Sequence, residues 1–272
     1  MICKRAWPRF KILLLILPIS ILYWSCEEMI EVKLKNENPK VVIESFISNG
    51  ESPVMVKITK SQPFFNQSNF TPVKNAYVQL EYLSRREKLI EREGGNYIAP
   101  RIKGMPGTDY TLNISTSGES FAATVNLPYS VPVDTAYFQA GLFRNDSLNV
   151  IVEFRDPADT ENYYRIKLFR NGRYAINDYY LMTDAFSNGE KIVAPIYYHY
   201  FAPGDSVVVE LLNLERNTWR YFKGISESIQ QGVNSQAPGN PPSNFSGGAL
   251  GIFGAWNSSI YRVIVPKTTG KK

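Results

Sequence analysis

Short strand-like segments separated by turn residues run through almost the whole chain after residue 40. Residues 41–47 and 54–59 are rich in Val and Ile, and a cluster with Asn, Gly and Pro at 49–53 separates them. Residues 76–83 alternate between two sets of side chains, which is the period of a strand that buries one face. This pattern predicts a mainly β protein.

Two β-rich domains are expected. Residues 40–130 hold about seven strand segments at intervals of about 8–12 residues, the spacing of an Ig-like or transthyretin-like sandwich. Pro128 and Pro132 stiffen the connection that follows, because proline interrupts strand pairing. Residues 131–266 have longer strand segments, including a hairpin at Asn171-Gly172, and form the second domain.

The second domain is expected to contain one short helix, within residues 214–230. Its apolar residues recur at helical spacing on one side: Leu214, Tyr221, Phe222, Ile225 and Ile229. Asn213 stands where a capping residue is needed. A loop rich in Pro, Gly, Asn and Ser follows at 232–248, two strands close the domain, and residues 267–272 form a tail.

Residues 1–25 have the composition of an export signal. Four basic residues and no acidic one accompany an apolar run of thirteen residues that ends at Trp24. As a helix this run spans roughly 20 Å, short of the roughly 30 Å hydrocarbon core of a bilayer. We therefore interpret it as a secretory signal peptide and not as a spanning helix.

Cys26 follows the apolar run, separated from Trp24 by Ser25. Ser25-Cys26 resembles a lipobox, in which the cysteine thiol receives diacylglycerol before the signal is cleaved, although Tyr23 stands where leucine is usual. Two or more acyl chains anchor a protein stably to a membrane. The alternatives are an uncleaved N-terminal anchor, or a cleaved signal followed by a cysteine that is there by chance. Residues 26–39 are mostly polar and charged, so we expect a flexible tether.

Charge and cysteine content restrict the function. The chain has 30 Lys and Arg against 25 Asp and Glu, and four of those bases lie in the signal, which leaves 26 against 25. A net charge of about +1 argues against nucleic acid as a partner. Cys26 is the only cysteine after the signal and His199 the only histidine, which excludes disulfides, thiolate metal sites and two-histidine zinc motifs. We expect no metal and no cofactor.

No catalytic residue is predicted. The chain has no Gly-x-Ser-x-Gly turn and no phosphate-binding glycine loop. Glu153 and Asp156 are the best-placed acid pair for glycoside hydrolysis, but residues 156–159 are more simply a turn stabilised by Asp side chains. His199 lies in an aromatic run at 197–201, where a structural or surface role is the simpler interpretation.

Partner contacts are expected in the second domain. It carries tyrosine pairs at 163–164, 179–180 and 197–198, and neighbours on a strand point to opposite faces, so one of each pair reaches solvent unless both faces are covered. Exposed aromatic residues and loops on a rigid scaffold make contact surfaces. The predicted partner-binding residues are Tyr198, Tyr200, Trp219, Asn244 and Phe245. The first domain would hold them away from the membrane.

Several motifs resemble, in order, a Bacteroidota lipoprotein family catalogued as a domain of unknown function, number 4249. They are Cys26-Glu27-Glu28, residues 39–44, 73–80, 95–97, 107–112, 154–157 with 163–164, 204–207, 241–244 and 247–255. The acidic pair after the cysteine also resembles the surface-export signal of Bacteroidota lipoproteins. The resemblance implies an outer-membrane lipoprotein, often encoded beside TonB-dependent transporters, and it implies no activity.

The expected function follows from these features together. We expect a non-enzymatic outer-membrane lipoprotein that faces the cell surface and acts as a binding or accessory subunit beside a TonB-dependent transporter. A stand-alone surface module that binds glycan or peptide is the alternative, and a glycoside hydrolase is the remote one.

Lipidation is tested directly at Cys26. Metabolic labelling with a fatty-acid analogue should mark the wild-type protein and leave Cys26→Ala unmarked, because the thiol is the acceptor of the lipid. Inhibition of the lipoprotein signal peptidase should also leave a precursor that is larger by residues 1–25. Equal labelling of the two proteins contradicts the prediction.

Overall fold

Strands make up most of the described chain, and the predicted mainly β fold with one helix is confirmed. The computed structural model describes residues 38–50, 53–62, 70–99, 102–140, 148–175, 179–197, 201–231 and 239–267. The predicted signal peptide, Cys26 and the predicted tether up to residue 37 lie outside these ranges, as do Tyr198, His199 and Tyr200.

The elements follow one another in this order. In the first half they are β1 (Val41–Ser48), β2 (Val54–Lys60), β3 (Thr71–Pro72), β4 (Tyr77–Tyr82), β5 (Arg85–Lys88), β6 (Ile90–Arg92), η1 (Glu93–Gly95), β7 (Asn96–Ala99), β8 (Asp109–Thr116) and β9 (Glu119–Asn126). In the second half they are β10 (Thr135–Ala140), β11 (Leu148–Arg155), β12 (Tyr163–Arg170), β13 (Arg173–Tyr174), β14 (Tyr180–Thr183), β15 (Lys191–Tyr197), β16 (Ser206–Leu214), α2 (Arg216–Gln231), η2 (Ser246–Gly248) and β17 (Leu250–Ile264).

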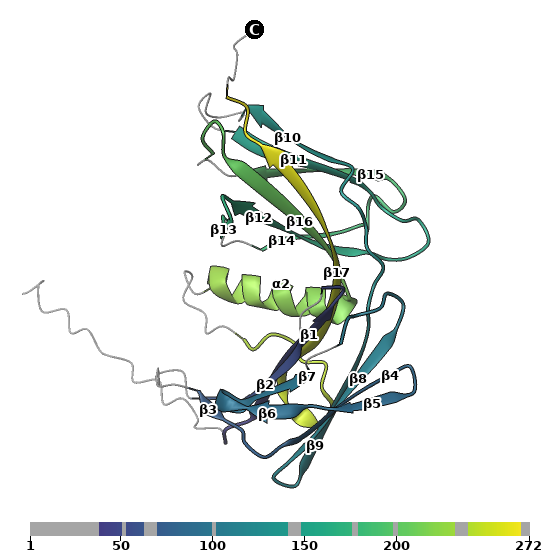
Figure 1. Cartoon of the computed structure of the whole chain (residues 1–272), viewed down its shortest axis with the longest axis vertical. Helices are drawn as coiled ribbons and strands as arrows, with labels where there is room; N and C mark the ends of the chain where they lie inside the picture. Colours follow the sequence, from purple (N-terminus) through teal and green to yellow (C-terminus); the bar gives the residue numbers. More distant parts are fainter. Residues whose placement is uncertain are drawn as a thin grey trace, which may run out of the picture. The chain divides into compact units, whose positions relative to one another are not determined.

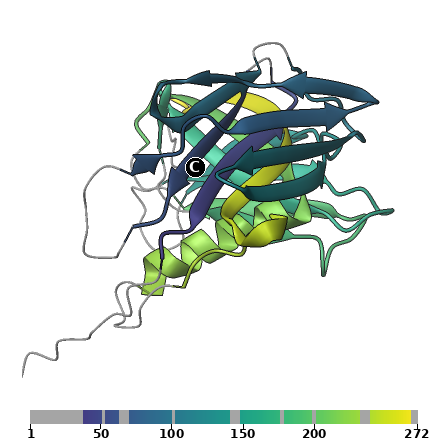
Figure 2. The same cartoon turned by 90° about the horizontal axis from the view of Figure 1, so that it is seen from below.

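One ten-stranded sheet, called here the main sheet, runs through both halves. Its order is β13-β12-β16-β17-β1-β2-β7-β6, with β14 also paired to β12 and β3 to β2 (Figure 1). Strand β17 pairs in parallel with β1 from Leu250 to Trp256 and antiparallel with β16 from Trp256 to Ile264. Figure 2 shows β1 (purple) and β17 (yellow) side by side. The last strand therefore joins the two halves into one sheet.

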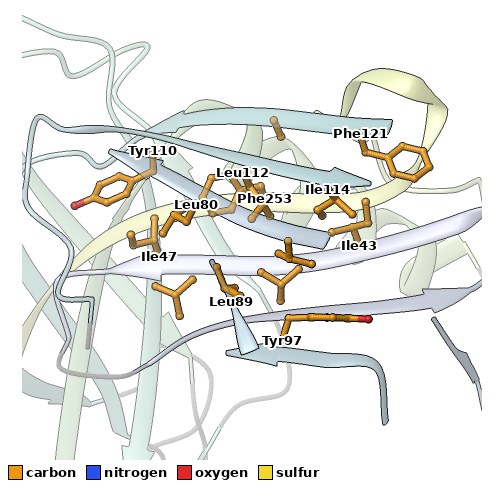
Figure 3. Packing of buried hydrophobic residues seen from close by; sticks show 14 of the residues in the cluster. Ile43, Ile47, Leu80, Leu89, Tyr97, Tyr110, Leu112, Ile114, Phe121 and Phe253 are labelled. Atoms are coloured by element: carbon orange, nitrogen blue, oxygen red, sulfur yellow. The ribbon is translucent and has the colours of Figure 1, made fainter. Parts of the chain in front are cut away.

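Two smaller sheets, β5-β4-β8-β9 and β10-β11-β15, pack on the main sheet. The first core joins β4, β8 and β9 to β1, β2 and β7, as Figure 3 shows, and includes Phe253 and Ala255 of β17. The second core joins the three-stranded sheet to β12 and β16, and the partly buried Tyr261 and Val263 of β17 pack against it. These β17 residues alternate along one side of the strand, so both smaller sheets lie on the same face of the main sheet. The predicted sandwich in the first half is confirmed.

Helix α2 covers the opposite face. A third core joins Tyr221 and Phe222 of α2 to Ile252 of β17 and to Phe46 of β1, whose ring is 5.8 Å from that of Phe222. The predicted cap at Asn213 is wrong. Residue 215 takes this role, because Glu215 Oε2 accepts the N–H of Thr218 at 3.0 Å and so satisfies a free donor of the first turn.

Asn213 belongs instead to a row of polar side chains beneath the connection between the halves. Its Nδ2 donates to the carbonyl of Tyr129 at 3.0 Å, Asn257 Nδ2 donates to that of Pro128 at 3.1 Å, and Ser259 Oγ to that of Val131 at 2.7 Å. These bonds satisfy the carbonyls of a segment that pairs with no strand. The expected boundary near residue 130 thus separates two cores but not two sheets, and residues 38–272 form one compact unit.

The predicted hairpin at Asn171-Gly172 is confirmed. Residues Phe169 and Arg170 of β12 face Tyr174 and Arg173 of β13. Both turn residues have positive φ, 49° and 78°, as the tight turns that suit the twist of a hairpin require.

The junction of β1 and β17 depends on the absence of a side chain at Gly251. Its φ is +94°, and a Cβ there would lie 2.1 Å from the carbonyl oxygen of Ile43. Gly118 has a similar φ of +83° with nothing within 4 Å of its Cβ position. Gly118→Ala should therefore cost about 1–2 kcal/mol of unfolding free energy, the cost of the left-handed backbone alone.

Gly251→Ala should cost about 1–3 kcal/mol more than Gly118→Ala, because the backbone of β1 must also move away from the new methyl group. Denaturant unfolding of the two variants and the wild type measures this difference. Equal losses in the two variants would mean that β1 and β17 are not packed this closely.

Candidate functional site

The three-stranded sheet β10-β11-β15 presents one face to the second core and the other face outward. The inward side chains are buried: Ala136, Val150, Val152, Phe154, Ala194 and Ile196. Alternate residues of the same strands must then point outward.

Cross-strand pairing gathers the outward residues into rows. Tyr137 of β10, Ile151 of β11 and Pro195 of β15 form one row. Val193 and Tyr197 flank Pro195 along β15 in the neighbouring rows. Tyr137 is 41% exposed, Val193 52% and Tyr197 52%, whereas Ile151 is buried in the middle. We call these five residues the tyrosine face.

An ion pair borders the tyrosine face and fixes the position of Tyr137. Lys191 Nζ lies 2.6 Å from Glu153 Oε2, and Tyr137 Oη donates to Glu153 Oε1 at 3.1 Å. The hydrogen bond from Lys191 lowers the pKa of Glu153, and the same bond raises the pKa of Lys191, so both remain charged near neutral pH. The pair adds no net charge to the surface, and the tyrosine ring needs little further ordering when something binds against it.

The free edge of β15 is poorly suited to the addition of another strand. Among the described residues, β15 pairs only with β11. Pro195 has no N–H to donate, and the carbonyl of Tyr197 already accepts from Tyr180 Oη at 3.2 Å. Contacts with a partner are therefore expected on the face of the sheet and not along its edge.

The tyrosine pairs expected from the sequence behave differently from one another. Tyr163 and Tyr164 are both buried, because α2 covers one side of β12 and the three-stranded sheet covers the other, which is the alternative in which both faces of the strand are covered. Tyr179 and Tyr180 are half-buried against the third and second cores. Tyr197 is the member of its pair that the structure describes, and it is exposed.

Sequence reasoning missed Tyr137. The segment 135–140 alternates Thr, Ala, Tyr, Phe, Gln and Ala, and Ala136 and Phe138 pack inward. That alternation is the signal that would have placed Tyr137 on the outside.

The other predicted partner-binding residues have packing roles. Phe245 is buried in the first core. Asn244 Nδ2 donates to the carbonyl of Phe253 at 2.8 Å, and its Oδ1 accepts the N–H of Phe253 at 3.0 Å. Trp219 is half-buried, with its ring 5.3 Å from that of Tyr163. The structure does not bring these three residues together with the tyrosine face.

The acid pair considered for glycoside hydrolysis does not share a cleft. Glu153 lies on the outer face beside Tyr137, whereas Asp156 turns inward, is buried, and accepts from Tyr164 Oη and from the N–H of Gly189 at 2.9 Å. Burial and the bond to Asp156 raise the pKa of Tyr164, which keeps its hydroxyl protonated. Asp156 therefore stabilises its turn, and the pair lacks the facing geometry of a glycosidase.

Two further features are absent from the described ranges. No group of three or more His, Cys, Asp or Glu side chains in them is placed to hold a metal ion. No helix in the same ranges has the length and apolar character needed to cross a bilayer.

Three of the solved structures that match this chain have low sequence identity and low TM-scores. A segment of two fibronectin type III domains from chicken tenascin is 14% identical, with 65% of this chain and 91% of that chain covered and a TM-score of 0.21. The chicken interferon gamma receptor alpha chain is 8% identical, with 84% and 98% covered and a TM-score of 0.24. The FN1-FN3 domains of chicken CNTN1 are 12% identical, with 84% and 67% covered and a TM-score of 0.28. Similarity at this level carries no argument about ligands.

The comparison with protein families gives a clearer result. No curated protein matches the chain. The family model described as "Domain of unknown function (DUF4249)" matches residues 27–262, which is nearly all of the sequence after Cys26. The chain belongs to this family.

Proposed function

We propose that this chain is a non-enzymatic accessory or binding subunit of the outer membrane, anchored through lipid on Cys26, facing the cell surface and working beside a TonB-dependent transporter. The position of Cys26 at the end of a short apolar run supports the anchor. The motifs that resemble this family support the transporter as partner, because the resemblance implies a gene often encoded beside TonB-dependent transporters. The tyrosine face is the observation that carries the binding role.

Three properties suit the tyrosine face to contact with a protein. Tyr137 and Tyr197 offer large rings with few rotatable bonds, a combination enriched among residues that dominate binding energy. Val193 and Pro195 add exposed aliphatic surface, which gains free energy only against apolar groups of a partner. The rigid sheet below them rests on a fully buried core, so binding orders little backbone.

The same exposed tyrosines also suit the second candidate, a stand-alone module that binds glycan or peptide. Aromatic rings contact sugars and peptides as readily as folded proteins. The two functions differ in what the protein is bound to in its own membrane, so isolation from that membrane distinguishes them.

The proposal predicts capture of a transporter through the tyrosine face. A tagged full-length chain, purified in mild detergent from native outer membrane, should carry a TonB-dependent transporter that mass spectrometry identifies. The double variant Tyr137→Ala/Tyr197→Ala should retain roughly tenfold less of it, because truncation of two interface tyrosines removes at least about 1–2 kcal/mol of binding free energy.

Tyr174→Ala is the matched control, because Tyr174 is 42% exposed on β13, outside the tyrosine face. It should capture the transporter as the wild type does. A wild-type chain that purifies alone and binds glycan supports the second candidate. Undiminished capture by the double variant contradicts the role of the tyrosine face.

A further inference from the structure

A groove lies at one edge of the first half, where the chain crosses twice between the main sheet and the four-stranded sheet. The first crossing leads from β3 to β4 through residues 73–76, and the second leads from β5 to β6 through Leu89. The crossings are joined by a hydrogen bond from the N–H of Asn75 to Glu91 Oε2 at 2.9 Å. The N–H of Leu89 also donates to the carbonyl of Val78 at 2.9 Å.

The groove has two lobes that share Asn75 and Glu91. One lobe has a volume of about 650 Å³ and is also lined by Tyr77, Lys88 and Ile90. The other has a volume of about 770 Å³ and lies between the shared residues and the turn at 92–94. Each lobe is within the usual size range of small-molecule sites, and the two adjoin at the residues they share.

The floor of the first lobe is rigid. Tyr97 is buried there, its Oη donates to the carbonyl of Val73 at 3.0 Å, and the same oxygen accepts the N–H of Ala76 at 3.0 Å. A ligand in this lobe would meet a surface whose hydrogen bonds are already made.

One wall of this lobe is an exposed aromatic ring that is held in place. Tyr77 is 45% exposed, its Oη accepts from Gln79 Nε2 at 3.0 Å, and Lys88 Nζ lies 5.4 Å from its ring centroid. A ring fixed in this way offers a flat apolar surface without a large cost in side-chain entropy.

A hydrogen-bond acceptor, Glu91, and a hydrogen-bond donor, Lys88, line the same lobe as the Tyr77 ring. Glu91 Oε2 accepts the N–H of Asn75, and the other carboxylate oxygen of Glu91 has no partner in the described part of the chain. Within the same ranges no ion pair neutralises Glu91 or Lys88. A wholly apolar ligand would bury these charges without compensation, which is costly. The lining carries charges of both signs, so it does not select a strongly charged ligand.

We infer that this groove binds a neutral oligosaccharide. The C–H face of a sugar ring is apolar and stacks on an aromatic ring such as Tyr77. Sugar hydroxyl groups both donate and accept, so they can donate to the unpartnered carboxylate oxygen of Glu91 and accept from Lys88 and from the side-chain amide of Asn75. Two lobes that share Asn75 and Glu91 fit consecutive sugar units of one chain better than a single sugar.

Titration of the full-length chain in detergent with three hexasaccharides tests this inference. Cellohexaose, maltohexaose and β-1,4-mannohexaose differ in chain shape, and saturation-transfer NMR detects each at millimolar concentration. At least one should bind the wild type. Tyr77→Ala should weaken that binding about tenfold, because the stacking surface is lost. Glu91→Gln should weaken it several-fold, because a charged acceptor is replaced by a neutral one.

Tyr77→Phe and Tyr174→Ala are the controls. Tyr77→Phe keeps the ring, and Tyr174→Ala removes a similarly exposed tyrosine elsewhere, so both should bind as the wild type does. Thermal unfolding checks that Tyr77→Ala remains folded, and Glu91→Gln gives a second reading if it does not. Failure of all three sugars to bind the wild type overturns the inference, and so does equal binding by wild type and both groove variants.

This test is separate from the test of the transporter. The double variant Tyr137→Ala/Tyr197→Ala leaves the groove intact and should bind the sugar normally. Loss of sugar binding in the groove variants with unchanged transporter capture would assign the two surfaces to different partners.

Discussion

The parallel pairing of β17 with β1 is the constraint on which the rest of the structure depends. It places strands from the two ends of the described chain side by side in the middle of the main sheet. The first core is completed by Phe253 and Ala255 of β17, and the second by Tyr261 and Val263. The four-stranded sheet and the helix therefore pack on surfaces that exist only after this pairing has formed, because β1 and β17 both contribute residues to the first and third cores.

The helix is fixed to the same junction. The N–H of Ala255 donates to Thr218 Oγ1 at 2.9 Å, and a Cβ on Gly254 would lie 2.9 Å from that oxygen and 2.7 Å from the ring of Phe46. Glycine at this position allows β1, β17 and α2 to meet closely, so the three elements share one contact point.

Several motifs that suggested the family serve the fold and not a ligand. Asp156 accepts hydrogen bonds from Tyr164 Oη and from the N–H of Gly189, and the side-chain amide of Asn244 bonds to both the N–H and the carbonyl of Phe253. Asp205 accepts from Arg170 Nε at 2.6 Å and from the N–H of Ala202 at 2.6 Å. Such motifs identify the architecture reliably because buried polar groups must be paired. For the same reason they say little about what the protein binds.

The sequence predicted what depends on local pattern. Alternation gave the mainly β class and the sandwich of the first half, helical spacing gave α2 within two residues at its start, and Asn171-Gly172 gave the hairpin. Pairing between distant strands could not be read in this way. The tyrosine face exists because Tyr137 and Pro195 meet across Ile151, and Tyr163 is buried by a helix that follows it by more than fifty residues. Local periodicity does not report such neighbours.

The place of β17 in the main sheet has a consequence for how the protein is made. Synthesis runs from the N-terminus, so β1 emerges long before its parallel partner, and the first core lacks Phe253 and Ala255 until every other described strand has been synthesised. The first core of the nascent polypeptide therefore stays incomplete until β17 has been synthesised. Any factor that must act on the polypeptide before its first core closes would have the synthesis of residues 49–249 in which to bind.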